Sequence, residues 1–393
     1  MTRILVLGNM ANDGYTLCKQ LVKMNVDVTL GANGIDFGMS YPEWEDAIID
    51  KPINPYDVKR NELKDSWEPP TWIKGFDFPL NLQFRGIPTR LRQLQKLKKF
   101  ISEFDIVEAH VPYSIACYFS KTPYIVCDEG WIRTLVKEKP HRTIKGKLVD
   151  RVSRSSYSKS KHIIITNPDT RKLFDVDWVK DKKKSFIPFP IDSEKYKPLS
   201  PEQIKIPFEM KKDEILLLSP ARQDWHIKGN DKMLRAFARF AKAVPNTRLI
   251  LSEWGEDCMK SKTLISTLGI KEKVEWIIPV LKHQLIQYYN LADIVLDQFL
   301  CGSWGTTTPE AMSCGKPVLL SYEESHIDWA FGEQPPIYKA FTEDEIFEGL
   351  YKLAKDIDYR EELGLKGREW IKRTHDPKDV AQRHINIWKS TLN

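Results

Sequence analysis

Short runs of apolar residues alternate with helical hydrophobic patterns along nearly the whole chain. This alternation is typical of parallel sheets covered by helices on both faces. The first series of expected strands comprises Ile4–Leu7, Val26–Leu30, Ile106–Ala109, Tyr124–Cys127 and His162–Thr166. The second comprises Glu214–Ser219, Arg248–Ser252, Val274–Ile278, Ile294–Asp297 and Val318–Ser321. The pattern therefore predicts an α/β protein with two parallel-sheet domains.

A proline-rich segment separates the two series. The segment has the sequence DSEKYKPLSPEQIKIPF, and its prolines Pro198, Pro201 and Pro207 interrupt regular structure, as in a linker. We place the boundary near residue 195, with a first domain at 1–195 and a second at 196–375. Residues 376–393 are expected to form a C-terminal helix that packs back on the first domain.

Three further segments have distinct patterns. Residues 41–86 are rich in Pro, Trp and Asp and poor in periodicity, which predicts a long excursion over the first domain. Met233, Phe237, Phe240 and Val244 recur at helical spacing and predict a stripe facing the core. After Thr342 the pattern is helical to the end of the chain.

The composition is that of a globular protein with large cores. Of 393 residues, 41% are apolar and 11% aromatic. The mean hydropathy of −0.43 argues against a membrane-spanning protein. The opening RILVL is too short for the core of a signal peptide, and polar residues follow it, so we expect a first strand and a cytoplasmic protein.

The six cysteines are scattered, without CxxC or His-spaced pairs. This spacing argues against a disulfide framework or a zinc site, so we expect reduced thiols and no metal.

The net charge of +6 is unevenly distributed, because basic residues dominate from Arg133 to Lys161. Only Glu138 and Asp150 oppose them. Such a run is compatible with peripheral contact with an anionic membrane, at its inner face, or with an acidic acceptor. The alternative is a solvated helix face. Nucleic acid is not expected, because the run lacks interleaved aromatics and any reader motif.

The segment from residue 302 to 318, GSWGTTTPEAMSCGKPV, gives the strongest functional signal. Thr308 is a suitable N-cap and Pro309 suits the first helical position, so Glu310 should lie in the first turn of a short helix. The preceding small residues can let backbone amides approach a phosphate. These candidate donor-binding residues are Gly302, Ser303, Gly305, Thr306 and Thr307. Glu310 would then bind ribose hydroxyls; alternatively, it only complements the helix dipole.

A second signal follows the expected strand Glu214–Ser219. The sequence PARQDWHIKGN supplies Arg222 and Lys228 just before a helix that begins near Gly229. A guanidinium and an ammonium suit a diphosphate, both for binding and as it departs with growing negative charge. Taken alone, the two cations would be interpreted as surface residues. Their position after an expected strand favours a ligand site, because ligands bind at the carboxyl ends of parallel strands.

Two loops of the first domain also follow expected strands. Asp128 and Glu129 come after Tyr124–Cys127, where paired acids could orient a substrate hydroxyl or act as a base; solvated loop acids are the alternative. The loop GNMANDGY contains Asn9 and Gly14 but lacks the GxGxxG spacing, which disfavours a nicotinamide dehydrogenase.

These residues carry a resemblance to a known family. The second domain resembles the donor-binding half of retaining family-4 glycosyltransferases, with GT-B architecture, from about Glu214 onward. The resemblance rests on ARQDWHIKGNDKMLRAF, YNLADIVLDQF and GTTTPEAMSCGKPVLLS. The first domain is similar in the strand and loop at Gly8, in FDIVEAH and in IPFPIDSEKYKP.

The resemblance implies two Rossmann-like domains facing a cleft and a nucleotide diphosphate sugar bound mainly to the second. By analogy Arg222 and Lys228 hold the diphosphate, Glu310 holds the ribose, Asn9 and Gly14 contribute from the first loop, and no cofactor or metal is required.

The chain departs from the family pattern at two positions. Many members have a second glutamate eight positions before the one matching Glu310, and here that position is Gly302. Where many members have His-Gly near the donor sugar, this chain has Glu129 and Gly130, and His110 is a possible substitute. A satisfied structural histidine is the other reading of His110.

The predicted function is a retaining, metal-independent hexosyltransferase that moves a sugar from a nucleotide diphosphate to a glycan, lipid or small-molecule acceptor. Arg222, Lys228 and Glu129 are the expected catalytic residues. The alternatives are a sugar-nucleotide epimerase of the same architecture and a non-catalytic sugar-nucleotide-binding protein. Base, sugar, acceptor and linkage are not predicted.

Overall fold

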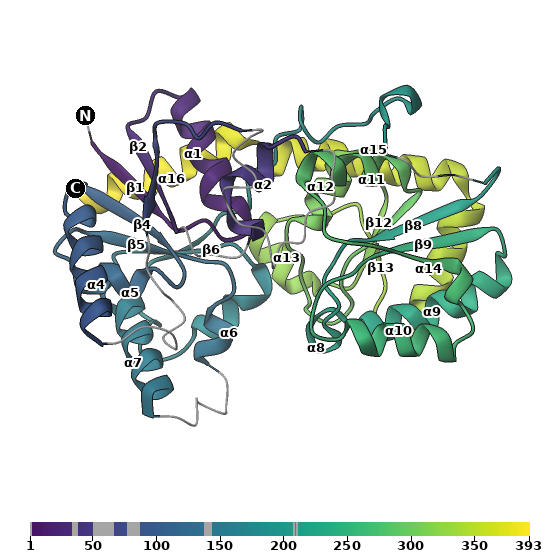
Figure 1. Cartoon of the computed structure of the whole chain (residues 1–393), viewed down its shortest axis with the longest axis horizontal. Helices are drawn as coiled ribbons and strands as arrows, with labels where there is room; N and C mark the ends of the chain where they lie inside the picture. The colour runs from purple at the N-terminus through teal and green to yellow at the C-terminus, as the bar shows by residue number, and fades with distance from the viewer. Residues whose placement is uncertain are drawn as a thin grey trace. The chain divides into compact units, whose positions relative to one another are not determined.

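The structure is a computed structural model that describes residues 2–33, 38–49, 67–76, 87–136, 144–206, 209 and 211–393. The chain forms two compact units, coloured along the sequence in Figure 1. Unit 1 contains Met1–Ala47, Tyr56–Pro190 and Pro377–Asn393, and unit 2 contains Ile48–Pro55 and Ile191–Asp376.

Unit 1 is built on a parallel sheet of seven described strands in the order β3-β2-β1-β4-β5-β6-β7. The strands are β1 (Ile4–Leu7), β2 (Val28–Asn33), β3 (Ile73–Phe76), β4 (Ile106–His110), β5 (Tyr124–Asp128), β6 (Ile163–Ile165) and β7 (Lys184–Phe186). In the central register Ile4 pairs with Val28 on one side and with Ile106 on the other. Every residue of β1, β4 and β5 is buried, as expected for strands covered on both faces.

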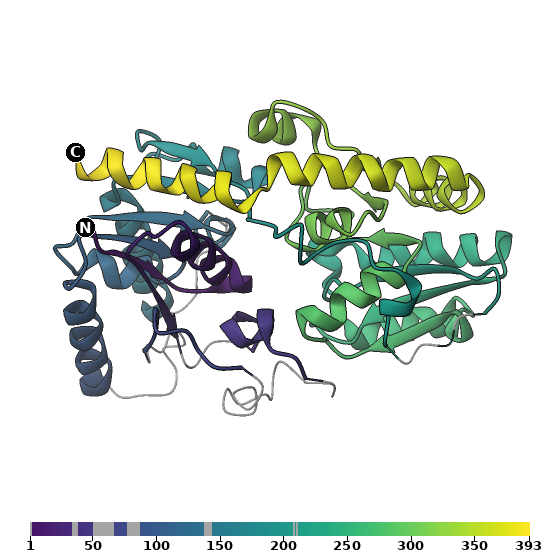
Figure 2. The ribbon, with the colours of Figure 1, turned by 90° about the horizontal axis from the view of Figure 1, so that it is seen from above.

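Helices cover the sheet of unit 1. They are α1 (Asp13–Lys23), α2 (Pro42–Asp46), α4 (Ile87–Ile101), α5 (Ser114–Tyr118), α6 (Ile132–Leu135), α7 (Ile144–Lys159) and α16 (Pro377–Leu392), with short 3-10 helices at Met10–Asn12, Gly38–Ser40 and Pro168–Phe174. Although α16 is last in the chain, Val380, Ala381 and Trp388 belong to the same core cluster as residues of α1, β1 and β4. Figure 2 shows α16 alongside α1.

Unit 2 has a parallel sheet of six described strands in the order β10-β9-β8-β11-β12-β13. The strands are β8 (Ile215–Ser219), β9 (Thr247–Ser252), β10 (Val274–Ile277), β11 (Ile294–Leu296), β12 (Val318–Leu320) and β13 (Tyr338–Lys339). The helices are α8 (Trp225–Lys228), α9 (Asn230–Ala243), α10 (Cys258–Thr267), α11 (Lys282–Leu291), α12 (Thr307–Ser313), α13 (Glu324–Phe331), α14 (Glu343–Lys355) and α15 (Ile357–Thr374), with 3-10 helices at Pro201–Gln203 and Lys271–Lys273.

The predicted fold class is confirmed. Each expected strand is present within a few residues of its predicted bounds, and the stripe on α9 is buried at Met233, Phe237 and Phe240. The helical pattern after Thr342 is also confirmed. Thr342 caps α14, since its hydroxyl oxygen accepts a hydrogen bond of 3.1 Å from the Glu345 amide.

The expectation for residues 41–86 is wrong in part. Helix α2 and strand β3 fall within this stretch, and β3 pairs with β2 from Leu30 opposite Ile73. Strand β3 has a partially exposed pattern because it is an edge strand, which weakens the hydrophobic signal. The remaining prediction for residues 50–66 and 77–86 lies outside the described residues.

Candidate functional site

The loop after β11 leads into α12, as the sequence predicts, but the helix starts earlier. It begins at Thr307 with Thr306 as the N-cap, so the assignment of Thr308 as N-cap is wrong. The Thr308 hydroxyl instead donates a 2.8 Å hydrogen bond to Asp297 Oδ2, at the end of β11. This bond ties the helix to the strand, and Glu310 still lies in the first turn.

The Glu310 carboxylate is held by two side chains of the preceding helix. Lys282 Nζ forms an ion pair with Oε1, and the Tyr289 hydroxyl donates a 3.0 Å hydrogen bond to Oε2. Glu310 is 3% exposed. Burial, with the charge of Glu310 beside it, raises the pKa of Tyr289 well above its usual value. The two contacts therefore fix the direction of the carboxylate.

Sequence reasoning missed Lys282 and Tyr289. Both lie on α11, seven residues apart, and this spacing of two turns brings them to one face of the helix. This spacing alone could not have identified them as partners of Glu310, because the sequence does not show that α11 packs beside α12.

Lys228 joins the two predicted phosphate segments. Its ammonium donates to Gln298 Oε1, and Gln298 Nε2 donates to the Ser303 carbonyl. The Lys228 carbonyl accepts a 2.8 Å hydrogen bond from the Phe299 amide. The loop after β8 and the loop after β11 are thus fastened together within unit 2.

Arg222 lies at the other end of the β8 loop and is paired with Asp224. Nε and Nη2 donate to Asp224 Oδ2 at 3.1 and 3.0 Å. Asp224 in turn accepts a 3.1 Å hydrogen bond from the Ile227 amide and so caps α8. The Arg222 side chain is 41% exposed, and a guanidinium has five donors, so it can still contact an anion.

The small residues before α12 differ in their surroundings. A Cβ added at Gly305 would meet nothing within 4 Å, so no neighbouring side chain crowds this point of the loop. Ser303 is fully buried, and its hydroxyl has no partner among the described residues. Between them Trp304 anchors the loop, since its ring lies 5.9 Å from Tyr322 and 6.1 Å from Phe331.

Gly302 has a φ of +75°, a conformation that L side chains rarely adopt. A Cβ at this position would lie 3.4 Å from Cγ of Glu323. The Glu323 amide donates to the Gly302 carbonyl at 3.1 Å. The exposed carboxylate of Glu323, which follows β12, therefore lies beside position 302, where many members of the family have a glutamate.

In unit 1 the two acids after β5 have different environments. Asp128 is buried and accepts hydrogen bonds from the Gly130 amide at 2.7 Å, from the Ile132 amide at 3.0 Å and from the Tyr157 hydroxyl. It therefore stabilises the turn into α6. Glu129 Oε1 lies 2.7 Å from His110 Nδ1, and its Oε2 has no partner among the described residues.

His110 belongs to a buried cluster of ionisable groups. Its Nε2 is 3.4 Å from Glu108 Oε1, and its Nδ1 is 3.9 Å from Asp13 Oδ2. Glu108 Oε2 accepts 2.9 Å hydrogen bonds from His384 Nδ1 and Trp388 Nε1 of α16. The cluster thus connects β4 with the last helix.

Burial and neighbouring charges set the protonation of this cluster. Burial raises the pKa of Asp13 to about 7, although His110 opposes the shift. Burial alone would lower the pKa of His110, but the neighbouring carboxylates of Glu108 and Glu129 hold it well above its usual value. Although burial opposes the shift, the charge of His384 helps to lower the pKa of Glu108 to about 2. The imidazolium of His110 therefore donates to Glu129 and lies beside the carboxylate of Glu108.

The other two predicted residues of unit 1 have structural contacts. The Asn9 side chain donates to Asn12 Oδ1 at 2.8 Å and to the Ser40 carbonyl at 2.7 Å, and it accepts from the Tyr15 amide at 2.7 Å. A Cβ on Gly14 would lie 2.5 Å from the Gly8 carbonyl, so glycine permits α1 to approach the loop after β1. Their predicted role in donor binding stays a prediction.

Asp13, His110 and Cys127 are the described residues whose potential ligand atoms gather most closely, within 4.8 Å of one another. His110 is already hydrogen-bonded to the Glu129 carboxylate, and burial raises the pKa of the Cys127 thiol. Both features favour a hydrogen-bonded cluster over a cation site.

No described helix combines the length and the apolar character needed to cross a bilayer.

Part of the chain is similar in sequence to known glycosyltransferases. Residues 201–370 match the family described as Glycosyl transferases group 1. An uncharacterized glycosyltransferase of Methanocaldococcus jannaschii is 23% identical over 190 residues, which span 46% of each protein. The alpha-monoglucosyldiacylglycerol synthase of Acholeplasma laidlawii is 22% identical over 302 residues, covering 69% of this chain and 67% of that protein.

Solved structures share the fold of the whole chain. Sucrose-phosphate synthase of Thermosynechococcus elongatus superposes with a TM-score of 0.69 at 13% identity, covering 99% of both chains. HepE of Anabaena, in complex with UDP and glucose, gives 0.69 at 16% identity, covering 99% of this chain and 100% of the other. The family match thus covers most of unit 2, and the solved structures show that the chain has the same two-sheet fold as these proteins.

Proposed function

We propose that this chain is a glycosyltransferase that moves a hexosyl group from a nucleotide diphosphate sugar to an acceptor, with retention of anomeric configuration. The observation that carries the proposal is the buried, fixed carboxylate of Glu310 at the start of α12, in the same unit as the joined segments of Lys228 and Gln298. HepE, which has a similar fold, was solved with UDP-glucose, which supports a nucleotide sugar as the donor.

The residues of unit 2 would act on the donor. Glu310 would accept hydrogen bonds from the ribose hydroxyls, and the ion pair with Lys282 orients the carboxylate before the nucleotide binds. Arg222 and Lys228 would contact the diphosphate, whose negative charge grows as the bond to the sugar breaks. The amides near Gly305 and Thr306 can approach the same phosphates.

Retention is compatible with a mechanism that needs no protein nucleophile. The bond between the anomeric carbon and the diphosphate oxygen breaks, and the acceptor oxygen forms a bond on the same face. The departing phosphate oxygen takes the acceptor proton, so atoms and charge balance. Cationic side chains supply the stabilisation that a metal ion gives in other enzymes, so we propose metal-independent transfer.

Glu323 is our candidate for a contact with the donor sugar. Its side chain lies beside Gly302, and a glutamate at position 302 itself would be strained by the positive φ. A carboxylate can thus reach this place from the end of β12 instead of from the β11 loop.

Unit 1 would supply the acceptor side. Glu129 has a hydrogen bond to His110 and a second oxygen with no partner among the described residues, so it would orient the acceptor hydroxyl while the departing phosphate takes the proton. The synthase of Acholeplasma laidlawii is named for a glycolipid product, and this supports a lipid among the acceptor classes. We accordingly propose action in the cytoplasm, with peripheral contact at the inner membrane face.

The test is a thermal-shift screen of nucleotide diphosphate sugars, followed by product analysis with the stabilising donor and candidate acceptors. A ligand that binds the native state raises its apparent stability by mass action. We expect one nucleotide class to stabilise the protein and a new glycoside to form, equally well with a metal chelator present. An isomerised nucleotide sugar would identify an epimerase, and binding without product would identify a non-catalytic protein. Absence of any stabilising nucleotide sugar would overturn the proposal.

A further inference from the structure

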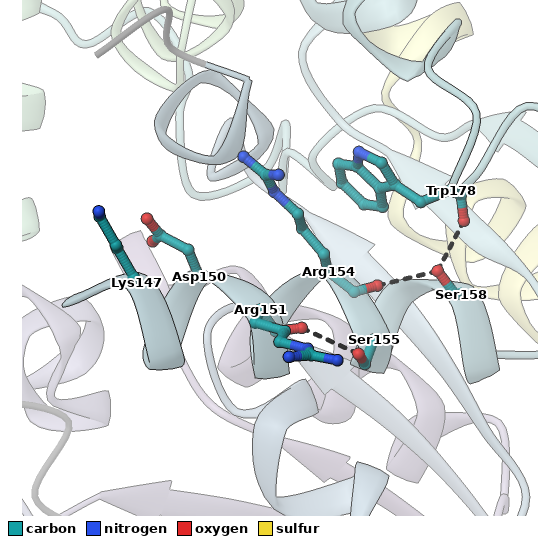
Figure 3. A pocket seen from close by; sticks show the side chains of 7 residues that line it. All are labelled: Lys147, Asp150, Arg151, Arg154, Ser155, Ser158 and Trp178. Atoms are coloured by element: carbon teal, nitrogen blue, oxygen red, sulfur yellow. Dashed lines mark hydrogen bonds between the residues drawn. The ribbon is translucent and has the colours of Figure 1, made fainter. Parts of the chain in front are cut away.

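A hollow of about 390 Å³ lies along α7 of unit 1 (Figure 3). Its lining consists of six residues of α7 and one aromatic residue: Lys147, Asp150, Arg151, Arg154, Ser155, Ser158 and Trp178. The α7 residues follow a spacing of three and four, so they occupy one face of the helix. The size falls within the range of small-molecule sites, roughly 300–1,000 Å³.

The charges of this lining favour an anion. The lining contains three cations and one carboxylate, Asp150, so two positive charges remain uncompensated by the lining itself. A phosphate monoester carries about −1.5 to −2 at neutral pH, which matches this excess. Figure 3 shows Lys147, Asp150 and Arg154 extending from the same side of α7, toward the side where Trp178 lies.

Arg154 is fixed in place before any ligand arrives. Its Nη2 donates a 2.6 Å hydrogen bond to the Leu135 carbonyl, and its guanidinium carbon lies 6.0 Å from the centre of the Trp178 ring. Its buried Nε has no acceptor among the described residues. A fixed cation with an unpaired donor is poised to bind an anion, because an unmet buried donor costs free energy.

The uncharged part of the lining suits hydroxyl groups and a flat apolar surface. The Ser155 hydroxyl donates to the Arg151 carbonyl at 2.9 Å, and the Ser158 hydroxyl donates to the Trp178 carbonyl at 2.6 Å. Because their hydrogens are already used, both oxygens offer lone pairs to a ligand that donates hydrogen bonds. The ring of Trp178, held edge to face by Tyr157 at 5.8 Å, provides the apolar wall.

From this combination we propose that the hollow binds a phosphorylated sugar or polyol, with the phosphate at Lys147, Arg151 and Arg154 and the hydroxyl-bearing part against Trp178. The same chemistry occurs in a free sugar phosphate and in a phosphorylated lipid headgroup. The site lies wholly within unit 1, and it does not depend on the proposed transfer reaction. Residues 137–143, which hold part of the basic run, lie outside the described residues and play no part in the proposal.

Calorimetric titration of the full chain with glucose 6-phosphate tests the site, with glucose and inorganic phosphate as comparison ligands. We expect saturable binding of glucose 6-phosphate, weaker binding of phosphate and none of glucose. The double variant Lys147→Gln/Arg151→Gln should weaken binding about tenfold or more, whereas Lys161→Gln, an exposed lysine outside the hollow, should not. Trp178→Leu should reduce the preference for glucose 6-phosphate over inorganic phosphate.

Two further measurements separate the possible sources and the alternatives. Cosedimentation with phosphatidylcholine vesicles, with and without phosphatidic acid, reports a lipid headgroup, whereas binding to free glucose 6-phosphate alone reports a soluble ligand. Binding should weaken as the pH falls below about 6, where a phosphate monoester loses its second charge. The proposal is overturned if neither probe binds, if the double variant binds like the parent, or if Lys161→Gln causes an equal loss. Thermal melts of each variant exclude unfolding as the cause.

Discussion

Glu129 Oε1 lies 2.7 Å from His110 Nδ1, although the two residues are 19 positions apart in the sequence. Strands β4 and β5 are neighbours, with His110 opposite Cys127, so the ends of the two strands bring the side chains together. The pair combines a carboxylate that has one oxygen unpaired among the described residues with an imidazolium buried behind it.

Replacing Glu129 by Gln should lower turnover about tenfold to a hundredfold and leave nucleotide affinity unchanged. The reason is that the carboxylate would act at the acceptor hydroxyl and not at the diphosphate. Steady-state kinetics and calorimetry with the nucleoside diphosphate measure the two effects. Glu103→Gln, at an exposed acid of the same unit, is the matched control. Parental turnover in Glu129→Gln would remove this residue from the site.

Replacing Asp13 by Asn should change how stability depends on pH. The folded pKa of Asp13 is about 7, above the ordinary 3.8, so the folded state binds the proton more tightly than the unfolded state. Its contribution is therefore greatest below about pH 4 and is lost as the pH rises toward 7. The loss amounts to a few kcal/mol, at about 1.4 kcal/mol per pH unit of difference.

Asparagine resembles the protonated acid, so Asp13→Asn should be close to the parent near pH 4 and more stable than the parent at pH 8. Urea unfolding at several pH values measures the difference. A constant difference in the free energy of unfolding between pH 4 and 8 would show that Asp13 titrates normally in the fold.

Replacing Glu310 by Gln should weaken binding of the nucleoside diphosphate by about 1.5–3 kcal/mol, because charged hydrogen bonds to the ribose are lost. The variant also leaves the partly buried ammonium of Lys282 without its counter-charge. Isothermal calorimetry gives the affinity, and Glu324→Gln, an exposed acid paired with Lys339, is the control. Unchanged affinity in Glu310→Gln would assign Glu310 to helix stabilisation alone.

Arg222→Ala and Lys228→Ala should each reduce transfer about tenfold to a thousandfold, because each removes one charge that stabilises the leaving diphosphate. Arg235→Ala is the matched control, since Arg235 is also part-exposed and paired with an aspartate, Asp231. Rates of glycoside formation and thermal melts should be recorded together. Parental rates in both variants would refute the assignment.

Trp388→Phe should destabilise unit 1 by roughly 1–3 kcal/mol. The aromatic packing is largely retained, but the buried carboxylate of Glu108 loses one of its donors. Combining it with Glu108→Gln in a double-mutant cycle isolates the interaction between the two side chains. Additive effects on the free energy of unfolding would show that the hydrogen bond contributes nothing.

The central strands of both sheets could be predicted because parallel strands that are buried on both faces leave apolar runs in the sequence. Edge strands β3, β7 and β13 were missed, since they are short and pair on one side only. Glu310 could be placed in its turn from local helix rules. Its contacts with Lys282 and Tyr289 could not, because they depend on how two helices pack. The bond between His110 and Glu129 likewise depends on strand order, which no local pattern encodes.

The anchoring of α16 has a consequence for the order of events during synthesis. Glu108 is made early, yet two of its hydrogen-bond donors, His384 and Trp388, follow it by 276 and 280 positions, after the whole of unit 2 has been made. Until then the carboxylate and the apolar surface around it, including Leu17 and Leu21 of α1, lack their final cover. We therefore expect unit 1 to complete its folding after unit 2, although most of unit 1 is translated first, and nascent chains stalled before residue 377 should expose this surface to chaperones.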